Sequence, residues 1–164
     1  MDADRPILIL EKSRTDKSID ILILITIVLT WILTIVNYNS LPEIIPIHQD
    51  LKGNIDNYGG KASIWFLPVI STLIIAGMRF INKFPHHFNY LVKITAGNAR
   101  SQYTGATRMI RYFQWMVALV FLFIVYDVVH SAHSGSSFIG VWFVPVLFLT
   151  FLGPLLISLL KRRD

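Results

Sequence analysis

Ionisable side chains gather in a polar segment, residues 39–61, between two apolar stretches. His48, Asp56 and Lys61 supply a titratable imidazole, a carboxylate and a cation there, a set that can bind a polar ligand. Imidazole and carboxylate also ligate zinc-like ions, although two residues fall short of the roughly three or four protein ligands that such sites use. The alternative is structural: His48 and Asp56 bond to each other across a turn, and Lys61 pairs with Asp56.

A second group of ionisable residues ends the third apolar stretch. Asp127, His130 and His133 follow at intervals of three, which spreads them over about 120° of a helix, so that only neighbours share a face well. Asp127 lies inside an apolar run, where an ionisable group is costly unless it is paired or faces a cavity. It is either a binding or proton site, or it bonds His130 or the 131–137 loop and ends the helix.

His48, His130 and His133 are the remaining combination for a zinc-like ion, and they would make the protein a membrane metalloenzyme. The sequence contains no His-Glu-x-x-His, no Gly-x-Ser-x-Gly and no phosphate-binding Gly-rich loop. These are ordinary catalytic signatures. We therefore expect a non-enzymatic protein without a cofactor.

Four apolar stretches must position these residues. The chain is 54% hydrophobic and 15% charged, whereas soluble domains carry nearer ~25% charged residues. The stretches are long enough to cross a hydrocarbon layer of ~30 Å as helices. We predict an all-α membrane protein with four transmembrane helices, at residues 19–38, 62–78, 112–129 and 138–160, in a single domain.

The basic residues indicate the orientation of these spans. All of the 15 Lys and Arg residues except Lys52 and Lys61 lie in the N-terminal tail, in the loop 79–111 or in the C-terminal tail. Basic segments beside spans stay on the cytoplasmic side, so both termini are expected inside, residues 39–61 outside and residues 79–111 in the cytoplasm. Anionic lipid headgroups, and not nucleic acid, are the expected partners of these charges.

Each loop has a predicted structure of its own. In the outer loop Pro42 and Pro46 favour extended chain and residues 52–54 favour a turn, which predicts a short β-hairpin. The cytoplasmic loop predicts an amphipathic helix on the inner leaflet. Its basic stripe places three arginines within about 80° of one another for contact with lipid: Arg100, Arg108 and Arg111.

Three further residues bear on the spans. Asp20 is expected in the first turn of the first helix, after a capping Ser18. Pro68 and Pro145 lack the N–H that would bond four residues back, which leaves the carbonyls of Ile64 and Val141 in need of partners. With Asp127, these carbonyls would line the path of an ion-coupled or proton-coupled transporter, which is the alternative function.

The outer loop also resembles a known family. Residues 41–61 follow the pattern Leu-Pro-x-x-Ile-Pro-x-His, four residues, Gly-x-x-Asp, four residues, Lys, and precede an apolar helix with Pro68. This is similar to the domain of unknown function 1648 family of bacterial integral membrane proteins, which forms the N-terminal part of SdpI-like proteins. Residues 88–95 are similar to the cytoplasmic loop of a small four-span branch of the family.

The resemblance implies a multi-pass protein of the bacterial cytoplasmic membrane. For SdpI-like members it implies immunity to a secreted toxic peptide, coupled to sensing of that peptide. We therefore expect recognition of a peptide or small ligand at the outer face. The residues expected to bind it are those of the two ionisable groups: His48, Asp56, Lys61, Asp127 and His130.

Overall fold

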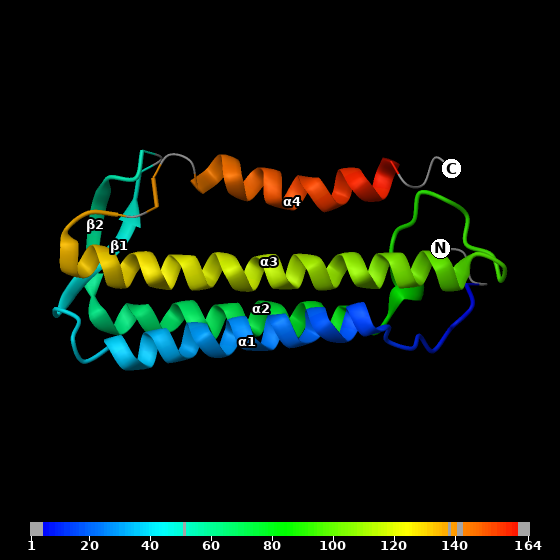
Figure 1. The fold of residues 1–164 in the computed structure, drawn as a ribbon, viewed down its shortest axis with the longest axis horizontal. Helices are drawn as coiled ribbons and strands as arrows, with labels where there is room; N and C mark the ends of the chain where they lie inside the picture. The colour runs from blue at the N-terminus through cyan, green and yellow to red at the C-terminus, as the bar shows by residue number, and fades with distance from the viewer. Residues whose placement is uncertain (1–4, 51, 138, 141–142, 161–164) are drawn as a thin grey trace.

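The computed structural model describes residues 5–50, 52–137, 139–140 and 143–160 of the chain. In this part the elements are α1 (Arg14–Asn37), β1 (Ile44–Gln49), β2 (Ile55–Gly60), α2 (Phe66–Ile81), α3 (Ala99–Ser134) and α4 (Phe143–Leu160), with 3-10 turns at Lys61–Trp65 and Pro85–His87. Figure 1 shows α1, α2 and α3 side by side, α4 along α3, and the hairpin at one end of the bundle. We call residues 38–50, 52–60, 131–137 and 139–140 the hairpin end, and residues 5–13 and 82–98 the loop end.

The bundle exposes apolar side chains and buries hydroxyl groups. Thr26, Thr30 and Thr34 are buried on α1, and each hydroxyl donates to the carbonyl four residues earlier. Large apolar side chains cover the exposed side of the same helix: Ile21, Leu24, Ile25, Val28, Leu29, Ile32 and Ile35. Small hydroxyl residues let helices approach closely where lipid is the solvent. Three helices, Arg14–Asn37, Lys61–Ile81 and Ala99–Ser134, are long and apolar enough to cross a membrane, which confirms a mostly helical multi-pass protein.

Polar side chains tie α2 to its neighbours. The Trp31 indole N–H donates to the Thr72 hydroxyl at 3.1 Å, which joins α1 to α2. The buried Gln114 amide donates to the Ile75 carbonyl at 3.1 Å, which joins α3 to α2. Such bonds contribute on the order of 1 kcal/mol each between helices in a membrane, and they fix the register of the bundle.

The first helix begins earlier than predicted. The Ser13 hydroxyl accepts the Asp16 N–H at 3.2 Å, and the Asp16 carboxylate accepts the Ser13 N–H at 2.9 Å. This reciprocal capping box satisfies two donors at the start of α1. The predicted cap at Ser18 is wrong, because the Ser18 hydroxyl donates to Arg14 within the helix and Asp20 lies in its second turn.

The predicted amphipathic helix is not a separate element. Residues 99–111 are the first turns of α3, which runs for 36 residues, about 54 Å at 1.5 Å per residue. Its buried face keeps one phase from Ala99 and Tyr103 through Gln114 and Ala118 to Val125. Because the same face packs along the whole helix, nothing bends its first turns onto a leaflet. A helix of this length extends beyond a hydrocarbon layer of about 30 Å.

Pro68 does not leave a carbonyl free. It lies in the first turn of α2, and the Phe66 N–H donates to the carbonyl of Ile64. The first N–H groups of a helix have no partner within the helix, so a proline there loses nothing. The prediction for Ile64 is therefore wrong. Pro145 lies at the same third position of α4, whereas Val141 lies outside the described residues.

The last helix packs against α3. It carries no charged residue, and the rings of Phe113 and Phe151 stack at 5.8 Å between the two helices. Three helices of the described chain meet the requirements of a span, so a fourth span at residues 138–160 remains a prediction.

Candidate functional site

The two strands form the predicted hairpin, closed by a turn built around Asp50. The strands are antiparallel, and the Asp50 carboxylate accepts the N–H groups of Lys52 and Asn54, each at 2.8 Å. The Asn54 side-chain amide also donates to it, and this bond is the main cause that holds the pKa of Asp50 below its ordinary value. Gly53 supplies a positive φ of 87°, a conformation that glycine adopts without strain.

The hairpin is anchored at its base and at its tip. Ile45 is 1% exposed and packs with Leu41, Ile64 and Val125 in an apolar cluster. At the tip, a Cβ added to Gly53 would lie 2.8 Å from the carbonyl oxygen of Ile139. The tip therefore lies directly against Ile139 and Gly140, which follow α3.

Asp127 is the point where three segments of the hairpin end meet. Asp127 is 1% exposed. Its carboxylate accepts a hydrogen bond from the Gln49 side-chain amide at 2.5 Å and another from the Ile139 N–H at 2.9 Å. The Ser137 hydroxyl lies 2.9 Å from the same carboxylate and 2.8 Å from the Gln49 amide oxygen. These donors compensate for removing a carboxylate from water, and they fasten β1, Ser137 and Ile139 to α3.

His48 and Asp127 line the same cavity of about 290 Å³. Its lining also includes apolar side chains, among them Ile124 and Val128 of α3. His48 Nδ1 lies 2.5 Å from an oxygen of Asp56 across the hairpin, as one of the two predictions for this pair states. The two side chains are 66% and 46% exposed. Because both side chains are exposed, a ligand can reach them. An exposed ion pair contributes less than about 1 kcal/mol to stability, so it costs a ligand little to replace it.

Lys61 pairs with a different carboxylate from the one predicted. Its ammonium lies 2.8 Å from Glu43 and 5.5 Å from the centre of the Tyr38 ring. Ile44 pairs with Gly60 in the sheet, so Glu43 is the residue opposite Lys61. The predicted pairing with Asp56 is wrong, because this register places Asp56 several residues further along the hairpin.

His130 and His133 lie on another face of α3. They line a cavity of about 470 Å³ with Leu33 and Asn37 of the α1 end. The His130 ring stacks on Tyr126 at 6.1 Å, and His133 Nδ1 lies 2.8 Å from the Val129 carbonyl. Within the described part of the chain, no three His, Asp or Glu residues could hold a metal ion. The combination of His48, His130 and His133 is therefore not assembled.

Two of the three arginines predicted to contact lipid form ion pairs within the protein. Arg108 Nε lies 2.9 Å from the buried Asp16, and Arg111 Nε lies 3.3 Å from Asp20. The helix face that carries them packs towards α1, so both side chains bond within the protein, and the contact of these two residues with lipid stays a prediction. Arg100 is exposed, and its contact with lipid remains a prediction.

Gln49 and Ser137 are the site residues that sequence reasoning missed. Alternation along β1 would place neighbours on opposite faces, but the register shifts between Pro46 and Gln49, so sequence alone does not predict which side chain turns inward. Ser137 enters the sequence-based prediction only as the last residue of the 131–137 loop that Asp127 could bond. At the other end of the bundle, the role of Asp16 at the start of α1 is predictable, since Ser13 precedes it by three residues as in a capping box.

This fold and site define a multi-pass membrane protein in which a β-hairpin joins two spans and docks on a third. Residues 25–72 match the family described as Domain of unknown function (DUF1648), which confirms the resemblance to this family over that part of the chain. The match includes His48, Asp56 and Lys61 but not Asp127. An uncharacterized protein of Archaeoglobus fulgidus is 29% identical over 161 residues, which cover 89% of this chain and 86% of that protein. No solved structure matches the chain.

Proposed function

We propose that the protein is a non-enzymatic membrane protein that binds a peptide or small ligand at its hairpin end. The observation that carries this proposal is the meeting of Gln49, Asp127 and Ser137 beside a cavity that His48 also lines. Buried ionisable groups in membrane proteins commonly mark binding sites.

The surroundings of the cavity favour a ligand with both polar and apolar parts. An apolar groove of about 450 Å³ runs between α3 and α4 and shares Ile139, Gly140 and Phe143 with the polar cavity. A donor group can bond His48, Asp56 or Asp127 while an apolar segment lies along the groove. A secreted peptide with apolar side chains meets this description, which agrees with the SdpI-like immunity and sensing expected from the family.

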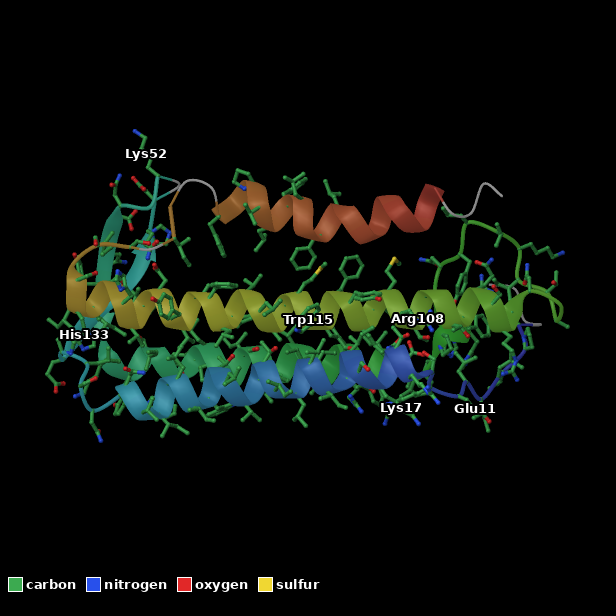
Figure 2. All side chains as sticks on the ribbon, in the orientation of Figure 1. Glu11, Lys17, Lys52, Arg108, Trp115 and His133 are labelled. Atoms are coloured by element: carbon green, nitrogen blue, oxygen red, sulfur yellow. The ribbon has the colours of Figure 1, made fainter. Side chains whose placement is uncertain are left out.

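The proposal includes an orientation. We place the hairpin end outside the bacterial cytoplasmic membrane, both termini inside, and α4 as a fourth span. The support is the charge distribution: Arg79, Arg100, Arg108 and Arg111 lie towards the loop end, whereas the hairpin carries Lys52 and Lys61. Figure 2 shows Lys52 and His133 at one end and Arg108 towards the other. Basic residues beside spans remain in the cytoplasm.

Binding is tested with purified protein in neutral-lipid nanodiscs and fluorescently labelled secreted peptides that are toxic to a sensitive host. The same peptides are used to challenge that host with and without the protein. We expect binding and protection with wild type, and a loss of about tenfold in affinity for the His48→Ala, Asp56→Ala double variant, equal to ~1.4 kcal/mol. Arg100→Ala is the control at the other end. Equal binding by all three proteins, or no binding and no protection, contradicts the proposal.

An ion-coupled or proton-coupled transporter is the second candidate, favoured by the buried carboxylate of Asp127 in α3. Such groups serve as ion or proton sites in transporters. Flux into vesicles containing wild-type protein or Asp127→Asn tests it. Equal proton and cation flux in the two preparations removes this candidate.

A further inference from the structure

Towards the loop end of the bundle, four basic side chains surround the carboxylate of Asp20. Lys12, Arg79, Lys83 and Arg111 line a cavity of about 130 Å³, and Asp20 is the acidic residue of its lining. Arg79 closes the last turn of α2, and Arg111 lies on α3. The cavity is thus built by segments that are distant in sequence.

The single carboxylate is shared among three of the four cations. Lys12 lies 2.5 Å from Asp20, Arg111 lies 3.3 Å from it, and Arg79 lies 3.9 Å from it. Lys83 has no ion pair with any described residue. Asp20 and Arg111 are largely buried, with side-chain exposures of 15% and 13%. Arg111 also lies 4.0 Å from Asp16, but Asp16 is already paired with Arg108. Asp20 therefore cannot neutralise the four cations alone, and a partly buried cation such as Arg111 is costly unless it is paired.

The cavity lies where the apolar parts of the helices begin. Asp20 precedes the exposed apolar surface of α1, which starts at Ile21, and Arg111 lies directly before the apolar run of α3 from residue 112. A larger cavity of about 640 Å³, whose lining also includes Glu11 and Asp16, shares Lys12, Lys83 and Arg111 with the smaller one. An anion can therefore approach from the loop end and also from the surrounding headgroup layer.

We propose that this cavity is a phosphate-binding site occupied by the headgroup phosphate of an anionic phospholipid. Guanidinium and ammonium groups bind phosphate through charge-assisted hydrogen bonds, and Arg79, Lys83 and Arg111 present both kinds of donor. A phospholipid carries its phosphate at the depth where the hydrocarbon layer begins, so its acyl chains lie along the apolar surface of α1 and α2 when its phosphate is in the cavity. The site involves neither the hairpin nor Asp127, and it is independent of ligand binding at the other end.

The test uses the whole protein in a neutral detergent. Thermal unfolding is followed while short-chain phosphatidylglycerol, short-chain phosphatidylcholine or inorganic phosphate is added. The site variant is Arg79→Ala, Lys83→Ala; Arg79 is 56% exposed with only a long contact to Asp20, and Lys83 is exposed, so both removals spare the fold. The control variant is Lys93→Ala, Arg100→Ala, which removes the same charge from exposed positions outside the cavity.

Phosphatidylglycerol is expected to raise the unfolding temperature of wild type and of the control variant, and phosphatidylcholine is not. The site variant should need about tenfold more phosphatidylglycerol for the same rise, since each basic residue near an anionic surface contributes measurably to lipid binding. If inorganic phosphate matches the effect of phosphatidylglycerol, the phosphate site stands and its occupant is the free anion. If the two double variants lose the response equally, the attraction is a diffuse effect of charge and the proposal is overturned.

Discussion

Replacement of Asp127 by alanine tests whether the hairpin is fastened to α3 through one carboxylate. The substitution removes the acceptor of the Gln49 amide and of the Ile139 N–H, which lie 2.5 and 2.9 Å from it. A hydrogen bond to a charged group contributes ~1.5–3 kcal/mol, and a buried donor left without an acceptor costs a similar amount. We expect Asp127→Ala to lower the free energy of unfolding by about 3–5 kcal/mol.

A double-mutant cycle isolates the contact between the two side chains. Gln49→Ala alone should cost about 1.5–3 kcal/mol, and the double variant should lose less than the sum of the single losses by ~1–3 kcal/mol. Reversible unfolding of the purified protein in mixed micelles gives these free energies. His48→Ala is the matched control on the same strand, and its exposed pair with Asp56 predicts a loss under about 1 kcal/mol. Additive losses at Gln49 and Asp127, or a larger loss at His48, would refute the reasoning.

Three further perturbations have defined outcomes. Gly53→Ala should cost about 2 kcal/mol or more and increase proteolysis of the hairpin, because φ is 87° and the new Cβ would lie 2.8 Å from the Ile139 carbonyl; wild-type resistance to protease would contradict the packing of the tip. Arg108→Ala should cost about 2–4 kcal/mol in the same unfolding assay, since it leaves the buried Asp16 with only the 4.0 Å contact to Arg111. A second substitution, Asp16→Asn, which removes the charge and keeps an acceptor for the Ser13 N–H, should recover part of the loss. The pKa of Asp50 is lowered in the folded hairpin, so the contribution of this turn to stability should be complete above pH 3.8 and lost as the pH falls through the lowered pKa. Amide exchange at Asn54 measures the opening of the turn, and Asp50→Asn should show no such pH dependence.

Three of the spanning helices and the hairpin are predictable from the sequence because their signals are local. Apolar length predicts a spanning helix, and prolines followed by a Lys-Gly-Asn turn predict a hairpin in the chain that joins two spans. The bond between His48 and Asp56 is predictable for the same reason, because the two residues flank one turn and lie in the same short sheet.

The remaining contacts depend on register and helix phase, which the sequence does not specify. A shift in the pairing of β1 turns Gln49 towards α3 and places Glu43 opposite Lys61. The continuous phase of α3 turns Arg108 and Arg111 towards Asp16 and Asp20. A basic stripe that faces solvent or lipid has the same sequence pattern as a basic stripe that faces a carboxylate on a neighbouring helix. The sequence therefore does not distinguish the two arrangements.

Labelling of single cysteines tests most directly the claim that the hairpin end and the loop end face opposite sides of a membrane. The chain contains no cysteine, so Lys52→Cys and Arg100→Cys each introduce one thiol at an exposed position without a background. In intact cells treated with a membrane-impermeant maleimide, the account predicts labelling of Lys52→Cys, and labelling of Arg100→Cys only after the cells are broken. Labelling of both variants in intact cells, or of Arg100→Cys alone, would contradict it.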